Sequence, residues 1–143
     1  MTGNVTIRRM KAEDYDDALA LWVSCGGVSL RSVEDSRAGI AAFLERNPGT
    51  CFAAEADGKV VGTILAGNDG RRGYLYHVAV GRAYRNRGIG TDLVRHATDS
   101  LRRAGIRKTA LVVLSSNLDG NEFWEHVGFT VREDLIYRNM AIS

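Results

Sequence analysis

Residues 74–91 have the sequence YLYHVAVGRAYRNRGIGT, and this stretch decides the fold. Aromatic and β-branched residues from Tyr74 to Val80 predict a β-strand. A basic loop that contains two glycines follows the strand. From Thr91 onward the apolar residues recur at helical spacing, which predicts a helix. The residues that give this spacing are Leu93, Val94, Ala97 and Leu101.

A strand that leads through a basic loop into a helix is suited to holding phosphate. The first amides of a helix have no partner within the helix and lie at the positive end of its dipole. Gly88 and Gly90 can adopt positive φ and let an anion approach the backbone closely. Arg85 and Arg87 add positive charge. The alternative is a surface turn with solvated arginines, which gives no reason for the two glycines.

Two common phosphate-binding motifs do not match this loop. A Walker loop requires Lys followed by Ser or Thr after its second glycine, and this loop lacks that pair. The dinucleotide-binding motif requires a third glycine where this chain has Leu93. The pattern that matches is Arg-x-x-Gly-x-Gly, formed by Arg85, Gly88 and Gly90. Between a strand and a long helix, this pattern resembles the acyl-CoA pyrophosphate loop of the GNAT family of N-acetyltransferases.

Two further segments resemble the same family. Residues 54–62, AEADGKVVG, are similar to its central hairpin. Residues 117–129 are similar to its Asn-x-x-Ala-x-x-Phe-Tyr-x-x-x-Gly-Phe segment, although Gly120 stands where Ala is usual and Trp124 where Tyr is usual. The matching positions are Asn117, Phe123, Gly128 and Phe129. The resemblance covers roughly residues 50–142 and is greatest to small bacterial acetyltransferases of the YpeA type.

The resemblance implies an α/β (α+β) fold of the GNAT type, with residues 1–143 as a single domain. Such a fold has a mixed, twisted sheet of about seven strands and about four helices on both faces. Apolar patterns predict strands at residues 5–10, 50–56, 59–66, 74–80, 108–114, 129–133 and 135–141. Helices are predicted at residues 12–24, from Ser32 to residue 46, at 88–103 and at 119–126. Asp57-Gly58 between two apolar runs predicts a tight hairpin.

Composition limits the other functions. The 143 residues, 45% hydrophobic and 25% charged, are typical of one globular domain. No apolar run approaches the ~18–20 residues of a membrane span, and the N-terminus lacks a signal peptide, which predicts a cytoplasmic location. The net charge of +2 suits a polyanionic cofactor and is not by itself typical of nucleic-acid binding. Cys25 and Cys51 are too few for a metal cluster, so no metal is predicted.

The resemblance implies acetyl-CoA as the cofactor and coenzyme A as a product. The strand residues Val78, Ala79 and Val80 would contact the pantetheine arm through their backbone, and the N–H of Val78 would polarise the thioester carbonyl. Asn117 would hydrogen-bond the pantetheine. The residues expected to hold the pyrophosphate are Arg85, Asn86, Arg87, Gly88, Ile89, Gly90 and Thr91.

The catalytic acid and base are less well defined by the resemblance. The family often uses a Tyr at the position of Trp124 to protonate the thiolate, and an indole N–H cannot do this at neutral pH. Trp124 would then line the thioester tunnel. The thiolate, whose reference pKa is about 8.5, would leave unaided, through water, or with help from Tyr137 or Tyr76.

For the base, the preferred hypothesis is that Tyr76 and ordered water relay the proton of the ammonium group. His77 has a suitable pKa and is the alternative on the strand, unless it is a hydrogen-bonded structural residue. Glu122 could also act through water. Strand alternation predicts two faces, with Tyr74, Tyr76, Val78 and Val80 on one and Leu75, His77 and Ala79 on the other.

The leading hypothesis is therefore an acetyl-CoA-dependent N-acetyltransferase that acts on a primary amine by direct attack in a ternary complex. The alternative is a weak or inactive acyl-CoA-binding or sensor domain, because the usual Tyr and carboxylates are missing. A nucleic-acid binder that uses the arginines and tyrosines around the loop leaves the two glycines unexplained. The acceptor, a small-molecule or peptide amine, is left open. A homodimer through the edges of the C-terminal strands is a further option.

Overall fold

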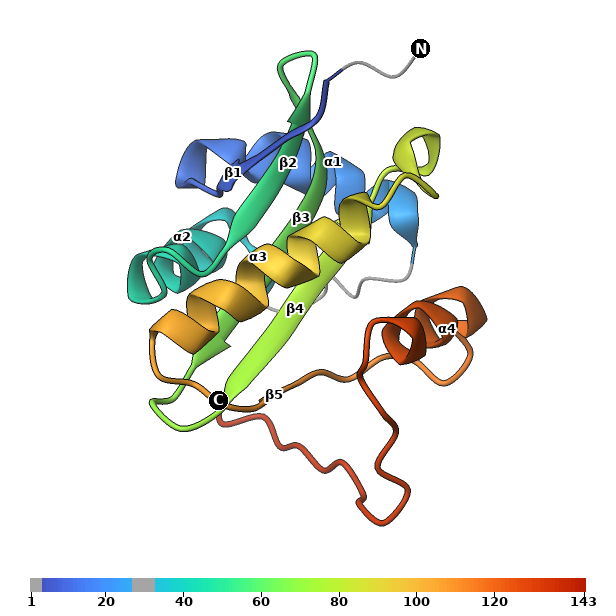
Figure 1. Ribbon diagram of the computed structural model, residues 1–143. Coiled ribbons are helices and arrows are strands. Elements are labelled where there is room, and N and C mark those ends of the chain that lie inside the picture. Colours follow the sequence, from blue (N-terminus) through green and yellow to red (C-terminus); the bar gives the residue numbers. More distant parts are fainter. Residues whose placement is uncertain (1–3, 27–32) are drawn as a thin grey trace. The chain divides into compact units, whose positions relative to one another are not determined.

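The computed structural model describes residues 4–26 and 33–143 and divides into two compact units, residues 1–112 and 113–143. The first unit holds a mixed five-stranded sheet (Figure 1) whose strands lie in the order β1-β2-β3-β4-β5. Neighbouring strands are antiparallel, except that β4 and β5 are parallel. The strands are β1 (Thr6–Arg9), β2 (Phe52–Ala56), β3 (Lys59–Asn68), β4 (Gly73–Val80) and β5 (Thr109–Ala110).

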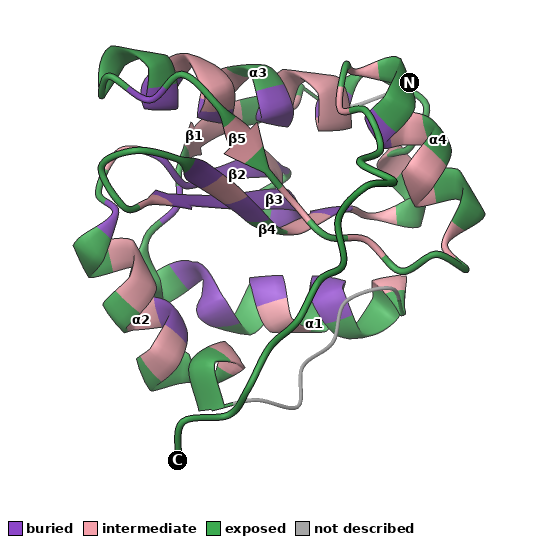
Figure 2. Cartoon of the chain, turned by 90° about the horizontal axis from the view of Figure 1, so that it is seen from below, coloured by how far each residue is buried: buried purple, intermediate pink, exposed green. Residues whose placement is uncertain are grey.

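Helices cover both faces of this sheet. Figure 2 shows α1 (Tyr15–Cys25) and α2 (Arg37–Arg46) on one face and α3 (Ile89–Arg103) on the other. Short 3₁₀ turns precede these helices: η1 (Ala12–Asp14), η2 (Val33–Asp35) and η3 (Arg82–Tyr84). The second unit contains α4 (Leu118–His126). The predicted α/β class with a mixed sheet is therefore confirmed.

The core follows the predicted helical spacing. On α3, all four predicted residues, from Leu93 to Leu101, are buried. On the opposite face α1 buries Tyr15, Ala18, Leu21 and Trp22, and the Trp22 side chain is fully enclosed. Each large apolar side chain that leaves water stabilises the fold by about 1.5–3 kcal/mol. The two helices thus fix the sheet, and with it the strand and loop that carry the candidate site.

Local turn signals decide where several elements begin and end. Asp57 and Gly58 have φ of 52° and 76°, as a two-residue hairpin with both residues left-handed requires, so the predicted hairpin is confirmed. The predicted start of the second helix at Ser32 lies outside the described residues. The structure begins α2 at Arg37, because the Oγ of Ser36 accepts a hydrogen bond from the Gly39 amide at 3.1 Å.

The strands predicted in the C-terminal part are wrong. The strand expected over residues 108–114 is reduced to Thr109–Ala110. Residues 113–143, all of which are described, form α4 and no strand, so the predictions for 129–133 and 135–141 fail and the sheet has five strands rather than seven. Residues with high β-propensity are those whose side chains suit a pleated sheet surface. Such a segment forms a strand only where a neighbouring strand pairs with it.

In residues 4–26 and 33–143, no helix has both the length and the apolar character that crossing a bilayer would demand.

Candidate functional site

The loop between β4 and α3 contains two residues with a left-handed backbone. Gly88 is the N-cap of α3 and has φ of 82°, as predicted. Gly90 lies in the first turn of α3 and does not use the positive φ that glycine allows. Asn86, with φ of 63°, is instead the second left-handed residue, a conformation that asparagine tolerates. Residues 85–88 are exposed.

The two loop arginines have different surroundings. The Nε of Arg85 donates to the carbonyl oxygen of Val80 at 2.9 Å, and its Nη2 lies 3.6 Å from the Sγ of Cys25. The guanidinium carbon of Arg87 lies 5.3 Å from the ring centre of Tyr84, a cation–π contact. Arg85 therefore ties the loop to the end of β4, and Arg87 places its charge over an aromatic ring.

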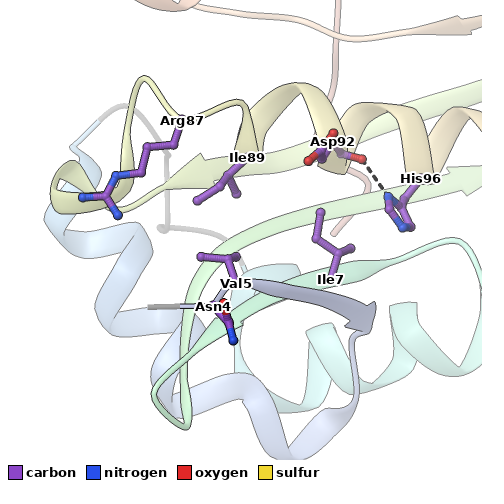
Figure 3. Close-up of a pocket in the computed structure, with 7 residues that line it drawn as sticks. All are labelled: Asn4, Val5, Ile7, Arg87, Ile89, Asp92 and His96. Atoms are coloured by element: carbon purple, nitrogen blue, oxygen red, sulfur yellow. Dashed lines mark hydrogen bonds between the residues drawn. The ribbon is translucent and has the colours of Figure 1, made fainter. Parts of the chain in front are cut away.

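A pocket of about 440 Å³ adjoins this loop, between the beginning of β1 and the first turns of α3 (Figure 3). The His96 ring points into it from α3, and its Nδ1 lies 2.9 Å from the carbonyl oxygen of Asp92. Two residues predicted to hold pyrophosphate, Arg87 and Ile89, thus also line this pocket. The full lining is Asn4, Val5, Ile7, Arg87, Ile89, Asp92 and His96.

A β-bulge interrupts β4 three residues before its end. Thr63 of β3 is opposite Ala79, whereas Leu65 is opposite Tyr76, so Ile64 alone faces two residues of β4. These two residues are His77 and Val78, and His77 has φ of 48°. An extra residue on one strand is the defining feature of a bulge, which bends and twists the strand locally. The alternation of side chains along β4 is therefore broken at His77.

The bulge overturns the predicted faces of the strand. The ring of Tyr76 lies 5.7 Å from that of Phe43 on α2, and the ring of His77 lies 4.5 Å from that of Trp22 on α1. Both helices cover the same face of the sheet (Figure 2), so Tyr76 and His77 share a face that alternation had divided between them.

His77 and Tyr76, the two candidate bases on β4, differ in exposure. The Nε2 of His77 lies 2.7 Å from the Oδ1 of Asp35, and the side chains of both residues are less than 15% exposed. Tyr76 is 44% exposed, and its ring lies 4.9 Å from that of Tyr74. Of the two, Tyr76 is the one that solvent and a dissolved amine can reach directly.

Three predicted residues, Asn117, Glu122 and Trp124, belong to the second unit. The Oδ1 of Asn117 accepts a hydrogen bond from the Gly120 amide at 2.9 Å and caps α4. A Cβ on Gly120 would lie 2.4 Å from the Nδ2 of Asn117, which gives a physical reason for glycine at this position. Trp124 is buried against the rings of Phe123 and Phe129, at 5.0 and 5.1 Å. Glu122 is exposed.

The structure thus groups the predicted residues in two sets. Those of β4 and the following loop lie together in the first unit, and those of α4 lie together in the second. The site also includes residues that the sequence did not single out, namely Asp35 beside His77 and Thr63 behind the bulge. Thr63 carries the one usable signal, because it is a hydroxyl inside the otherwise apolar run of β3.

The site thus consists of a bulged strand, an exposed, glycine-containing turn and a long helix, and a helix N-terminus is a position that suits a phosphate group. Residues 13–129 match the model of the acetyltransferase (GNAT) family. The chain therefore belongs to this family, which confirms the predicted class of enzyme, an N-acetyltransferase that uses acetyl-CoA. The finer resemblance to the YpeA type stays a prediction.

Individual relatives agree with this assignment. The chain is 30% identical to the acetyltransferase SG1711 of Sodalis glossinidius (strain morsitans) over 130 residues, which are 91% of this chain and 90% of the relative. Ard1 of Thermoplasma volcanium superposes with a TM-score of 0.79 at 20% identity, covering 90% of this chain and 84% of its own. PaiA N-acetyltransferase of Thermoplasma acidophilum, solved with coenzyme A, gives 0.77 at 21% identity, covering 91% and 92%. The two solved structures confirm the fold.

Proposed function

We propose that this protein transfers the acetyl group of acetyl-CoA to a primary amine of a small molecule or peptide, by direct attack while both substrates are bound. The observation that carries the proposal is the loop after β4, where Asn86 and Gly88 are left-handed and Gly88 begins α3. The first amides of a helix have no partner within the helix, and those of α3 follow directly after the exposed residues 85–88.

The loop suits the polyanionic end of acetyl-CoA. A Cβ on Gly88 would meet no atom within 4 Å, so open space lies in front of the backbone at this point. Arg85 and Arg87 add two positive charges within three residues of Gly88. We assign the pyrophosphate to Arg85, Asn86, Arg87, Gly88, Ile89, Gly90 and Thr91.

Acetyl-CoA, when bound, supplies the acetyl group as a thioester. We assign the N–H of Val78 to the thioester carbonyl and the backbone of residues 78–80 to the pantetheine arm. Tyr76 is the residue that we propose for passing the ammonium proton to water, since its side chain is exposed, whereas that of His77 is mostly buried. The roles of Asn117, Glu122 and Trp124 rest on the family resemblance and remain part of the proposal.

Two glycine variants test the loop. In Gly88→Val, a β-branched residue at φ of 82° is strained by about 1–2 kcal/mol, and its methyl groups enter the space in front of the amides. Calorimetric titration with coenzyme A should show at least about a tenfold loss of affinity, equivalent to about 1.4 kcal/mol. The matched control is Gly70→Val, at φ of 91° and with equally open surroundings, which should bind like the unaltered protein. Equal affinities in both variants would contradict the assignment.

The alternative function, acyl-CoA binding without efficient transfer, is favoured by Trp124, whose indole packs against two phenyl rings and cannot act as a general acid at neutral pH. A screen of amino acids, polyamines, aminoglycosides and short peptides with acetyl-CoA separates the two, with thiol release as the signal. Turnover with any amine supports transfer. Coenzyme A binding with no turnover across the panel would support the sensor.

Three further predictions, on domain organisation, cellular location and partners, complete the proposal. Residues 1–143 act as one GNAT domain, the protein works in the cytoplasm, and it has neither a nucleic acid nor a membrane as a partner. The homodimer predicted from C-terminal strand edges also stays a prediction, although residues 113–143 contain no strand to provide those edges. Sedimentation velocity measures it directly.

A further inference from the structure

A buried chain of hydrogen bonds holds the bulge of β4 from behind. The indole Nε1–H of Trp22 donates to the Oγ1 of Thr63 at 2.8 Å. The Oγ1 of Thr63 lies 2.7 Å from the carbonyl oxygen of His77. Trp22 and Thr63 are both 0% exposed, so these bonds are shielded from bulk solvent. The chain connects α1 through β3 to the bulged residue of β4.

The chemistry of the three groups fixes the direction of the chain. An indole N–H can only donate, and a carbonyl oxygen can only accept. The single hydrogen of the Thr63 hydroxyl must therefore point to His77, while a lone pair receives Trp22. Since one hydroxyl makes both bonds, a side chain without that hydroxyl would release Trp22 and the His77 carbonyl together.

The orientation of the His77 carbonyl also sets that of the next amide. A trans peptide unit is planar, and its C=O and N–H point in opposite directions. Thr63 draws the carbonyl of His77 toward the interior, so the N–H of Val78 in the same unit points away from Thr63. In the pairing of β3 with β4, Ala79 and Tyr76 have partners on β3, and the peptide group between His77 and Val78 lies in the bulge between them. The left-handed φ of His77 is a conformation that a non-glycine residue keeps only when its surroundings hold it.

We infer that Trp22 and Thr63 are positioning residues for acetyl transfer, which hold the peptide of His77 and Val78 so that the Val78 N–H faces the thioester carbonyl. This inference rests on the proposed function. Removing one such donor from an acyl-transfer site lowers kcat by about 10²–10³-fold, and losing only its alignment should cost a smaller factor, roughly 10–100-fold.

The test compares threonine variants with the amine that gives turnover in the acceptor screen. Thr63→Val keeps the shape and removes the hydroxyl, and should lower kcat by roughly 10–100-fold with the KM for acetyl-CoA changed by less than about threefold. Thr63→Ser keeps the hydroxyl and should restore most of kcat. Trp22→Phe removes only the first bond of the chain and should give an intermediate loss.

The matched control is Thr50→Val. Thr50 is also buried, and its Oγ1 lies 2.7 Å from the carbonyl oxygen of Ala66 on β3 and 3.3 Å from that of Asn47, neither of which belongs to the bulge. It should lose stability with little change in kcat. Equal kcat values for Thr63→Val and Thr50→Val, or a Thr63→Ser variant as impaired as Thr63→Val, would overturn the inference.

A second measurement separates this inference from the proposed function. A ketone analogue of acetyl-CoA keeps the carbonyl group, but its acetyl group cannot be transferred to an amine. It should shift the NMR signal of the Val78 amide in the unaltered protein and in Thr63→Ser. The shift should be largely lost in Thr63→Val while the analogue still binds. An unchanged shift in Thr63→Val overturns the inference even where turnover is normal, whereas the absence of turnover in every variant overturns only the proposed function.

Discussion

The two units of the chain treat similar apolar side chains differently. In residues 1–112, Ile64 and Leu65 of β3 are at most 2% exposed. In residues 113–143, Leu135 and Ile136 are 60% and 79% exposed, although their local sequence is equally suited to a strand. The difference teaches that β-propensity becomes a strand only where distant segments supply a partner and a covering helix.

The largest expected difference between the units is in amide hydrogen exchange. Amides of β3 lie in a sheet covered on both faces and should open only with global unfolding, so they should exchange on the order of 10⁴-fold or more slowly than free amides. Amides of residues 130–143 should exchange at nearly the rate of an unfolded chain. Exchange followed by mass spectrometry on the intact protein measures both. Strong protection of residues 130–143 would show that a partner strand covers them.

Truncation of a large apolar side chain should lower the free energy of unfolding by several kcal/mol more in the first unit than in the second. Trp22→Ala removes a fully buried side chain together with its bond to Thr63, and should lower the free energy of unfolding by about 3–5 kcal/mol. Ile136→Ala removes an exposed side chain and should change it by less than about 0.5 kcal/mol. Urea denaturation provides both values. Similar decreases in the free energy of unfolding for the two variants would contradict the difference between the units.

Two ion pairs with nearly equal hydrogen-bond lengths sharpen the comparison. Arg8 donates two hydrogen bonds of 2.8 and 2.9 Å to the carboxylate of Asp14, and Arg132 donates two of 2.9 Å to that of Asp134. The Asp14 side chain is only 7% exposed, whereas that of Asp134 is 66% exposed. Asp14→Asn should lower the free energy of unfolding by about 1–3 kcal/mol, because Arg8 loses a charged partner. Asp134→Asn should leave the urea midpoint unchanged.

The same aspartate gives the pH dependence a sign. Burial acts to raise the pKa of Asp14, but the hydrogen bonds from Arg8 and from the Lys11 amide, with the charges of Arg8 and Lys11, together outweigh it, so the pKa lies below its usual value in the folded protein. A carboxyl with a lowered folded pKa stabilises the fold above its unfolded pKa of about 3.9, and this contribution is lost as pH falls through the folded value. Urea midpoints between pH 7 and pH 3 should therefore fall less steeply in Asp14→Asn than in the unaltered protein. Parallel curves would contradict this.

The smallest effect is expected at the start of α4. Gly120→Ala should displace the Asn117 cap, which costs about 1 kcal/mol, while alanine gains about the same helix propensity. The exchange rates of α4 amides should barely change. In an Asn117→Ala background no cap remains to lose, and Gly120→Ala should there slow exchange by roughly fivefold, as a gain of about 1 kcal/mol predicts.

The part of the fold that sequence predicts well is the part built from local signals. The strand, loop and helix of residues 74–103 and the Asp57-Gly58 hairpin were recognisable because glycine, charge and apolar period agree there with the final structure. The bulge at His77 was not predictable, since the alternation of side-chain types along residues 74–80 does not show where an extra residue is inserted. The contacts of His77 with Asp35 and Trp22 join segments 42 and 55 positions apart in the numbering, and no local pattern encodes them.

The two thiols differ in accessibility, so that one of them can be labelled selectively to follow the loop between β4 and α3. Burial raises the pKa of Cys51 to about 11, so at neutral pH it holds almost no thiolate. Cys25 is partly exposed, and its sulfur touches Arg85, the residue that anchors the turn before α3. An alkylating dye should therefore label a single position without any engineered cysteine, and its emission would follow the turn as a nucleotide ligand comes and goes.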